Sequence, residues 1–553
     1  ALDRPPGAFE TGMHRFGMLI MRITVLMVLF VLMINTLTHK PLLDSFLFAI
    51  ALAVGLTPEL LPMIVSVTLA RGALRMAEKH VIVKRLAAIQ NLGSMDVLCT
   101  DKTGTLTEAT ISLERHVDID GAASAHVLEL AYLNSVFETG LKSPLDEAIL
   151  ANARLDASRW TKDDEVPFDF ERRRVSVLLD DGATRVLIVK GAPEDVLALS
   201  TGYAANGDGP ACAWDEATRA KAQQQLDSLA TQGMRSLAIA FKPVARDCDH
   251  AAVSDEAQLV FAGFAAFLDP PKKSAAKALA ALVAGGIAVK ILTGDSAAVT
   301  RHVCEKLAVP VTGVLTGDEI AELTEQALQA RVEAVNLFCR VNPAQKSRII
   351  LALKARGHVV GYLGDGINDA PALHSADVGL SVNTAVDVAK DAADMILLKR
   401  DLNVLYAGVL DGRRTFANVR KYIMMGTSSN FGNMFSMAAA SVFLPFLPML
   451  PAQILMNNVL YDFSEVAIPL DYVDPEEIKG PQAWDVKFIR DFMWIMGPVS
   501  SLFDFLTFYI LLVVLQANEK LFHTGWFVES LVTQVLVIFV IRTRRNPLGS
   551  RPH

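Results

Sequence analysis

The chain has 553 residues, of which 52% are hydrophobic and only 20% are charged. Soluble globular chains are about a quarter charged, so this composition excludes a disordered or purely soluble protein and indicates a membrane protein with a large aqueous part. The net charge is −8 without a block of one sign, which gives no indication of nucleic acid as a partner. The five cysteines form no CxxC pair, so we expect reduced thiols rather than a disulfide framework or a zinc ribbon.

Six apolar segments are long enough to span a bilayer as helices, a task that takes about 20 residues. They cover residues 17–38, 44–70, 422–444, 449–470, 491–515 and 525–541. The last segment is short and contains Glu529, and the alternative for each is a buried core helix. Lys and Arg gather on one side of the segments, at 71–79, 413–421, 487–490 and 542–545, so the positive-inside rule places residues 71–421 in the cytoplasm.

The predicted cytoplasmic part has a nested organisation. Residues 94–105 form a predicted strand and loop, and residues 269–400 contain repeated strand–loop–helix units, which favour a parallel α/β sheet. Residues 113–268 have a different sequence pattern from residues 269–400. They include a glycine-rich acidic loop at 201–210, which is typical of a surface insertion.

Three apolar runs of this part end in acidic or polar residues. They lead into Asp101, into Thr293 and into Asp365. Ligands of open parallel sheets bind beyond the carboxyl ends of the strands, so we expect these three residues at one edge. An aspartate there can attack a phosphoryl group, Asp365 and Asp369 can supply oxygen ligands for Mg²⁺, and Lys346 can supply a positive charge. Each motif alone is also consistent with an ordinary turn.

Polar residues inside the apolar segments predict a cation site. Glu59 lies between Pro58 and Pro62, and prolines free backbone carbonyls at membrane depth. The alternative is a proline kink with a hydrogen bond between helices.

Two later segments add oxygen donors on shared helix faces. These donors are Asn430 with Asn433, and Asn458 with Asp462. A set without Cys or His suits hard cations such as Mg²⁺, Ca²⁺ or alkali ions, while the alternative is polar contact between helices. Glu465 is a further acid that we do not expect to be a direct ligand, and the same holds for Asp504.

Residues 101–107 read DKTGTLT, and this motif resembles the phosphorylation motif of P-type ATPases. The family's other motifs follow in its order: DPPK at 269–272, TGD at 293–295 and GDGINDAPAL at 364–373. Residues 58–62 (PELLP) resemble the proline break of its fourth membrane helix. The resemblance covers essentially the whole chain, and its arrangement is most similar to the bacterial magnesium-transporting branch.

The resemblance implies an α-helical membrane domain with α/β cytoplasmic domains, namely a haloacid-dehalogenase-like, Rossmann-like phosphorylation domain with an inserted α+β nucleotide-binding domain. The implied parts are a linker at 1–16, membrane helices at 17–70, stalk and phosphorylation domain at 71–112, nucleotide domain at 113–268, phosphorylation domain at 269–400, stalk at 401–421, membrane helices at 422–541 and a tail at 542–553. The family also has an actuator domain with a TGE loop, two earlier and two later membrane helices, which this sequence does not contain. We therefore expect this chain alone to form a phosphoenzyme without efficient turnover.

The resemblance also implies roles for individual residues, with ATP and Mg²⁺ as cofactors. Asp101 would be phosphorylated, and Asp101, the Thr103 carbonyl and Asp365 would hold the catalytic Mg²⁺. The phosphate would be surrounded by Lys346, Thr293, Gly294, Asn368 and Asp369. The nucleotide would be bound by Phe168, Arg173, Lys190, Gly191, Arg235, Thr293, Gly294 and Asp295. Taken singly, Phe168 is more typical of a core residue and Arg235 of a surface charge.

The function implied is ATP-driven cation transport, and the leading hypothesis is Mg²⁺ import across a bacterial inner membrane. The partners would be ATP, the cation and the lipid bilayer, without nucleic acid. One alternative is a P-type pump for Ca²⁺, H⁺ or K⁺. Another is a membrane-anchored haloacid-dehalogenase-type phosphatase, but such enzymes usually carry a second Asp where this chain has Thr103. The third is a non-catalytic membrane protein, which the presence of Asp101, Lys346 and Asp365 disfavours.

Overall fold

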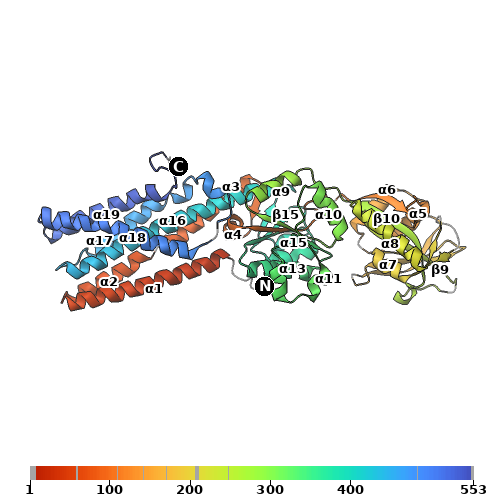
Figure 1. Ribbon diagram of the computed structural model, residues 1–553, viewed down its shortest axis with the longest axis horizontal. Helices are drawn as coiled ribbons and strands as arrows, with labels where there is room; N and C mark the ends of the chain where they lie inside the picture. Colours follow the sequence, from red (N-terminus) through yellow and green to blue (C-terminus); the bar gives the residue numbers. More distant parts are fainter. Residues whose placement is uncertain are drawn as a thin grey trace. The chain divides into compact units, whose positions relative to one another are not determined.

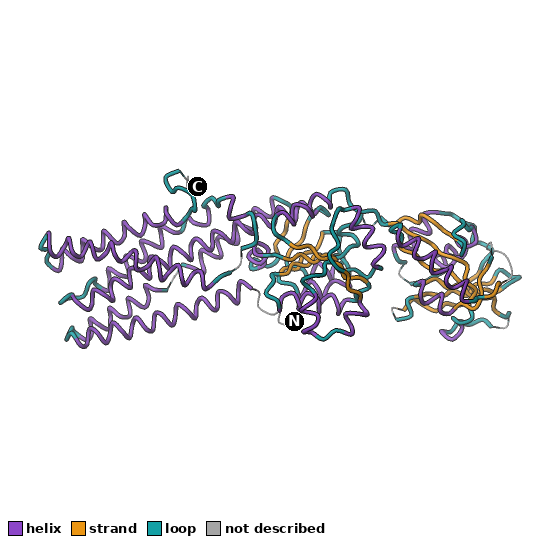
Figure 2. Tube along the Cα trace, viewed as in Figure 1, coloured by secondary structure: helices purple, strands orange, loops and turns teal. Residues whose placement is uncertain are grey.

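The structure is a computed structural model that describes residues 8–57, 60–108, 110–140, 142–169, 171–205, 211–246, 248–482 and 484–549. The chain divides into two compact units, and Figure 1 labels the helices and strands that make them up. The first comprises residues 1–99, 280–289 and 350–553, and the second comprises residues 100–279 and 290–349. Figure 2 shows that long helices dominate the first unit.

The first unit contains a bundle of helices. α16 packs against α18 and α3, α1 packs against α2, and α17 contacts both α2 and α19. The bounds of these helices are α1 Ala8–Leu37, α2 Leu42–Leu56, α3 Leu61–Glu78, α16 Leu402–Phe443, α17 Pro451–Glu465, α18 Val486–Tyr509 and α19 Glu519–Ile541. α18 continues into a π-helical turn at Ile510–Val514.

Four helical stretches of the described chain are long and apolar enough to cross a membrane. They are Phe9–Leu37, Leu42–Glu78, Val486–Val514 and Glu519–Ile541. The predicted third and fourth segments correspond to part of α16 and to α17. α16 carries many buried polar residues, and α17 has 15 residues. At about 1.5 Å per residue α17 is shorter than the roughly 30 Å of a bilayer core, so these two spans stay predictions.

Large apolar side chains cover the outer faces of the bundle. Leu26 is 68% exposed, Leu502 is 66% exposed and Phe503 is 60% exposed. In water such surfaces would be costly, whereas in lipid they are expected. The interior holds Phe16, Phe48 and Trp526, all nearly inaccessible.

The first unit also contains five strands that neighbour one another in the order β1-β16-β15-β14-β2. β14, β15 and β16 pair in parallel, while β1 is antiparallel to β16. Their bounds are β1 Val81–Val83, β2 Val97–Thr100, β14 Val360–Leu363, β15 Val378–Val382 and β16 Met395–Leu397. The helix α4 (Ala88–Ser94) lies so close to α16 that a Cβ on Gly93 would come within 2.5 Å of the Gly412 carbonyl oxygen.

Three parallel strands in the order β11-β13-β12, with helices α10 to α13 between or after them, belong largely to the second unit. Only the first two residues of β11 and the last six residues of α13 belong to the first unit. The bounds are β11 Ala288–Leu292, α10 Ala297–Lys306, β12 Val314–Thr316, α11 Gly317–Glu322, α12 Glu325–Arg331, β13 Leu337–Cys339 and α13 Pro343–Ala355. Strands joined through helices produce the parallel α/β arrangement that the sequence predicts.

A second, largely antiparallel sheet in this unit has the order β4-β5-β6-β9-β10-β7-β8, with β3 also paired to β10. Its strands are β3 Ser112–Val117, β4 Thr161–Asp169, β5 Arg174–Asp180, β6 Arg185–Gly191, β7 Ser200–Ala204, β8 Ala211–Ala213, β9 Arg235–Val244 and β10 Leu259–Leu268, and its helices are α5 Ala125–Phe137, α6 Pro144–Asn152, α7 Pro193–Leu199 and α8 Glu216–Thr231.

Both faces of this antiparallel sheet are covered by side chains. Val177 and Ile188 belong to the apolar cluster that includes α5 and α6, while their neighbours Leu178 and Leu187 belong to the cluster that includes α8. Successive side chains of a strand point to opposite faces, so one apolar run supplies both cores. The combination of α/β parts and apolar helices confirms the predicted fold class.

Candidate functional site

The predicted nucleophile Asp101 follows the fully buried strand β2 directly. The Lys346 ammonium, on α13, lies 3.3 Å from the Asp101 Oδ1 atom. The Lys346 side chain is 5% exposed and that of Asp101 is 16% exposed, so the carboxylate can be reached while its cation is held in the interior. This pairing brings together two of the predicted site residues within the second unit.

The loop after Asp101 is attached to residues 269–272. Thr107 Oγ1 donates to the Asp269 carboxylate at 2.5 Å, and Lys272 Nζ donates to the carbonyl oxygens of Gly104 at 2.6 Å and Thr105 at 3.0 Å. Gly104 has a φ of 72°, which favours glycine. The motif therefore forms a turn that is fixed by Lys272 and Asp269.

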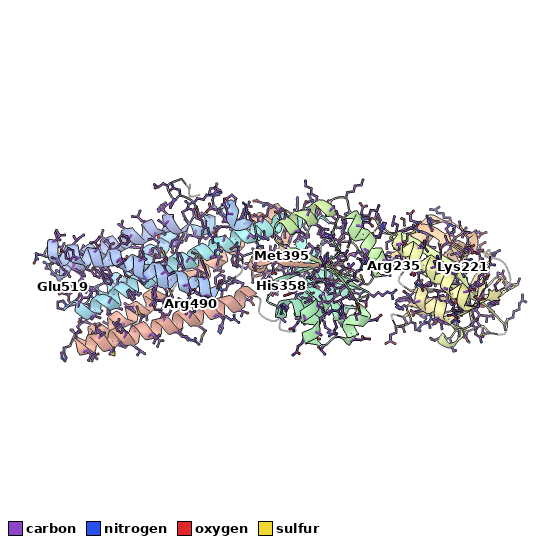
Figure 3. All side chains as sticks on the ribbon, viewed as in Figure 1. Lys221, Arg235, His358, Met395, Arg490 and Glu519 are labelled. Atoms are coloured by element: carbon purple, nitrogen blue, oxygen red, sulfur yellow. The ribbon has the colours of Figure 1, made fainter. Side chains whose placement is uncertain are left out.

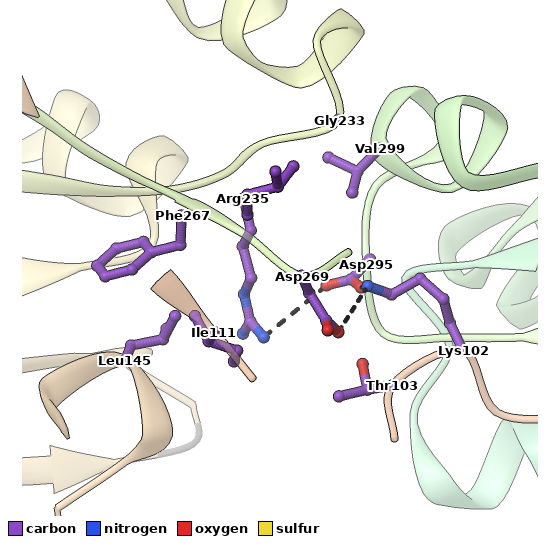
Figure 4. Close-up of a pocket in the computed structure, with 11 residues that line it drawn as sticks. Lys102, Thr103, Ile111, Leu145, Gly233, Arg235, Phe267, Asp269, Asp295 and Val299 are labelled. Carbon is purple, nitrogen blue, oxygen red and sulfur yellow. Dashed lines mark ion pairs between the residues drawn. The ribbon is translucent and has the colours of Figure 1, made fainter. Parts of the chain in front are cut away.

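A cleft beside this loop gathers charged groups (Figure 4). Its lining includes Lys102, Thr103, Arg235, Asp269 and Asp295. Lys102 Nζ lies 2.8 Å from Asp295 and 3.7 Å from Asp269, and an Arg235 nitrogen lies 3.8 Å from Asp295. Burial acts to raise the pKa of Asp295, but the charges of Lys102 and Arg235 outweigh it and hold the pKa below its ordinary value.

The residues after β11 are arranged for contact with a bound group. Thr293 is 2% exposed, its N–H donates to the Phe338 carbonyl at 2.9 Å, and its hydroxyl accepts from the Asp295 N–H at 3.1 Å. A Cβ placed on Gly294 would have no described atom within 4 Å. The turn is thus held on one side by the sheet and left open on the other.

The predicted nucleotide residues fall into two groups in the antiparallel sheet. Arg173, Lys190 and Gly191 meet at one end of the β5–β6 pair, where the Ala192 N–H donates to the Arg173 carbonyl at 2.9 Å. Phe168, on β4, is 50% exposed, as a platform for a base requires. Arg235 lies apart from them at the start of β9, with its side chain 55% exposed (Figure 3).

Ion pairs hold two of these cations. Lys190 is 4% exposed, contacts the Asp146 carboxylate and donates to Ser135 at 2.9 Å. Arg173 makes two hydrogen bonds to Asp195, at 2.8 and 3.0 Å, and these raise the pKa of its guanidinium. The buried pair explains why a lysine occurs in a core strand.

The first unit contains the predicted residues that follow β14. Asp369 is 1% exposed and accepts hydrogen bonds from the Tyr362 hydroxyl at 2.6 Å and from the N–H groups of Asp365 at 3.2 Å and Gly366 at 3.1 Å. Its carboxylate therefore organises the loop that carries Asp365. Asn368 is exposed and Asp365 is half-buried.

The predicted donors of the third and fourth apolar segments are all buried in the bundle. Asn430 and Asn433 are each 4% exposed, Asn458 is 7% exposed and Asp462 is 8% exposed. Asn433 Oδ1 accepts a hydrogen bond from Ser530 of α19 at 2.9 Å. In the described part of the chain, no group of three His, Cys, Asp or Glu residues is placed to hold a metal, so a cation would rely on amide donors as well.

Glu59 lies outside the described residues. Sequence reasoning missed Lys102 and Asp269 as parts of the cleft, although both belong to the recognised motifs. It also missed Ser530, because a single serine in an apolar helix gives no distinguishing pattern.

Two family profiles match the chain. One, described as the cytoplasmic domain N of P-type ATPases, covers residues 117–274, and one described as the C-terminus of cation transporting ATPases covers residues 446–552. The matched parts, together with an aspartate that follows a buried strand and is paired with a lysine, define the class: the chain belongs to the P-type ATPase family.

Curated relatives specify the similarity further. The chain is 50% identical over 556 residues to proteins named "Magnesium-transporting ATPase, P-type 1" from Salmonella typhimurium LT2 and Escherichia coli K12, which covers 99% of this chain and 61% and 62% of those proteins. It is 34% identical over 479 residues to "Probable cation-transporting ATPase F" of Mycobacterium tuberculosis H37Rv, which covers 77% of this chain and 52% of that protein. The chain thus spans about three fifths of the length of the magnesium-transporting relatives.

Proposed function

We propose that the chain is the phosphorylation, nucleotide-binding and partial membrane portion of an ATP-driven cation pump that imports Mg²⁺. The observation that carries the proposal is the Asp101–Lys346 pair, with 3.3 Å between the Lys346 ammonium and the Asp101 carboxylate. A reachable carboxylate next to a buried cation has the charge arrangement that phosphoryl transfer requires.

The proposed reaction begins with attack of an Asp101 carboxylate oxygen on the γ-phosphorus of ATP. An oxygen–phosphorus bond forms, the bond between that phosphorus and the bridging oxygen breaks, and ADP leaves with the electron pair. Lys346 stabilises the added negative charge of the acyl phosphate. Thr293 and Gly294, whose turn is open on one side, would donate to the phosphate oxygens, as would Asn368.

The residue types fit a catalytic Mg²⁺. Asp101, the Thr103 carbonyl and Asp365 would hold the ion, and all three are hard oxygen donors. The ordered loop around Asp369 supports this assignment because it fixes the backbone next to Asp365. The ion would neutralise phosphate charge when bound.

The nucleotide would be bound by the antiparallel sheet. Phe168 would stack on the adenine, Arg173, Lys190 and Gly191 would line its site, and Arg235 would contact the phosphates. The exposure of Phe168 and Arg235 supports roles in binding, and the position of Arg235 beside Asp295 supports a role near the phosphates.

Mg²⁺ is the cargo that the membrane residues favour. Asn430, Asn433, Asn458, Asp462 and Glu59 would provide oxygen donors, and a site with few charges suits a cation that keeps some of its water. The name of the relatives at 50% identity supports the same ion. The lipid bilayer would be a bacterial inner membrane, with residues 71–421 in the cytoplasm.

The test uses the complete protein, purified and reconstituted in lipid vesicles, because this chain alone is not expected to turn over efficiently. ATP hydrolysis is followed at saturating Mg·ATP while free Mg²⁺, Ca²⁺, K⁺ and pH are varied in turn. We expect a specific response to free Mg²⁺ that disappears in Asp462→Asn, while Asp101 is still phosphorylated. A response to another ion would reject Mg²⁺ as cargo, and hydrolysis of simple phosphate esters without ion dependence would favour the phosphatase.

A further inference from the structure

We infer that Glu465 is an additional ligand for the transported divalent cation, one helical turn beyond Asp462 at the C-terminal end of α17. The inference rests on the proposed function, because it extends the cation pathway which that function requires. Glu465 is 0% exposed, and neither of its carboxylate oxygens has a hydrogen-bond partner among the residues that the structure describes.

The Tyr461 hydroxyl, one turn earlier on the same helix, interacts with the Glu465 carboxylate but donates its proton to Ser429 Oγ at 3.0 Å. Lys421 of α16 and Arg542 after α19 belong to helices that pack against α17, and both pair with Asp471, at 2.9 and 2.8 Å. A buried carboxylate without a partner is unfavourable, and inside a membrane domain it indicates a functional site that a bound cation completes.

Glu465 shares a helix face with the two predicted ligands of α17. Asn458, Asp462 and Glu465 are spaced i, i+4 and i+7, which aligns their side chains along one side of the helix. Seven residues correspond to about 10 Å along a helix axis, so a cation could pass from one end of this line to the other in short steps.

The facing helix α16 leaves room beside Glu465. A Cβ placed on Gly426 would lie 3.7 Å from Glu465 Oε2, and Tyr461 contacts Ser429 three residues further along α16. These two contacts set an antiparallel register between α16 and α17. In this register Glu465 falls opposite the position that has no side chain, while the Asn458 side chain lies against Gly55 of α2.

A second oxygen on the same face of α16 is also unpartnered. Asn430, one helical turn from Gly426, is 4% exposed, and its Oδ1 atom has no hydrogen-bond partner among the described residues. Amide and carboxylate oxygens are the donors that Mg²⁺ and Ca²⁺ take. Two such oxygens near a vacant side-chain position therefore indicate a cation site rather than a packing contact.

The experiment measures Mn²⁺ binding by electron paramagnetic resonance, with the purified, nucleotide-free protein in lipid nanodiscs. All variants carry Asp101→Asn, which removes a catalytic Mg²⁺ ligand. We expect Glu465→Gln, which keeps the side-chain shape, to weaken Mn²⁺ binding at least tenfold. Glu465→Asp should weaken it less. The matched control is Glu519→Gln at the exposed start of α19, and it should leave binding unchanged (Figure 3).

A second variant leaves the carboxylate in place. Gly426→Ala adds a methyl group at ordinary contact distance from Glu465 Oε2, so the bundle should fold normally while the cation position is occupied. We expect a comparable loss of Mn²⁺ affinity. Unchanged affinity in Glu465→Gln would overturn the inference, whatever Gly426→Ala shows.

The experiment distinguishes rejection of the role of Glu465 from rejection of the proposed function itself. If Asp462→Asn abolishes Mn²⁺ binding while Glu465→Gln does not weaken it, the cation function stands and the role of Glu465 is rejected. If the protein with all of its membrane residues intact shows no saturable Mn²⁺ binding, the cation function itself is rejected.

Discussion

The ammonium group of Lys102 lies 2.8 Å from the carboxylate of Asp295, and less than a tenth of either side chain is exposed. Lys102 is the residue next to the predicted nucleophile, and Asp295 ends the turn that contains Thr293. One buried ion pair thus joins two motifs that lie far apart in the sequence. It determines how the loop at residues 101–107 is presented to the cleft.

Removal of Lys102 is expected to destabilise this junction. Lys102→Met leaves Asp295 buried with less compensation, and loss of one partner of a buried pair costs about 3–5 kcal/mol. The readout is hydrogen exchange of residues 101–107, which should accelerate. Lys221→Met is the control, because Lys221 pairs with Asp120 at the exposed surface and should leave this exchange unchanged (Figure 3).

The same pair predicts a dependence on pH. The pKa of Asp295 is lowered in the folded protein, so its ionisation stabilises the fold above the unfolded pKa of about 3.9 and this stabilisation is lost as pH falls. The difference in thermal stability between the parent protein and Lys102→Met should therefore be largest near neutral pH and shrink toward acid. A difference that is constant with pH would contradict this account.

Asp101→Asn is expected to abolish transfer of labelled phosphate from ATP to the protein. The amide is a far poorer nucleophile than the carboxylate, so the acyl phosphate cannot form. The control is Asp120→Asn at the exposed surface, which should keep the full label. Acid-stable labelling that persists in Asp101→Asn would show that another residue is phosphorylated.

Phe168→Ala is expected to weaken nucleotide binding with little effect on stability. Stacking of a base on an aromatic ring contributes about 1–3 kcal/mol, so the dissociation constant should rise roughly 5- to 150-fold. Phe168 is 50% exposed, which is why its loss should disturb the core little. Fluorescent nucleotide titration measures the affinity, and Phe168→Trp should bind nearly as well as the parent.

Lys190 calls for a design that separates structure from binding. Lys190→Met alone leaves Asp146 buried and uncompensated, so the sheet should lose about 3–5 kcal/mol of stability. The double variant Lys190→Met with Asp146→Leu removes the closest pair of charges, while Glu138, the second carboxylate beside Lys190 at 3.4 Å, has a pKa that burial already raises. This variant should recover part of that stability, because Asp146→Leu also removes the acceptor for Ser135 and Ser143. If Lys190 contacts the nucleotide, the double variant will still bind it weakly, whereas full recovery of binding would assign Lys190 to structure alone.

Much of this molecule could be predicted from local patterns. The composition and the apolar segments indicate a membrane protein, and the motifs at 101–107, 293–295 and 364–373 indicate the family, because its chemistry requires particular residues at adjacent positions. Each of these patterns spans a few adjacent residues, so it can be recognised without knowledge of the fold.

Other features depend on residues that are distant in the chain. The observed helix boundaries differ from the predicted ones. α1 begins at Ala8 rather than near residue 17. α16 continues from Leu402 to Phe443 without a break at the predicted membrane boundary. An uninterrupted helical backbone gives no local signal where water ends and lipid begins.

The partners of the buried charges follow from the folded chain and not from the local sequence. In the sequence Lys190, Asp295 and Glu465 lie in or next to apolar runs, but the groups that neighbour them come from other elements. Lys190 has Asp146, Asp295 has Lys102, and Glu465 has the space beside Gly426. Burial makes such charges costly unless they are compensated, and compensation depends on distances of a few ångströms that the folded chain alone establishes.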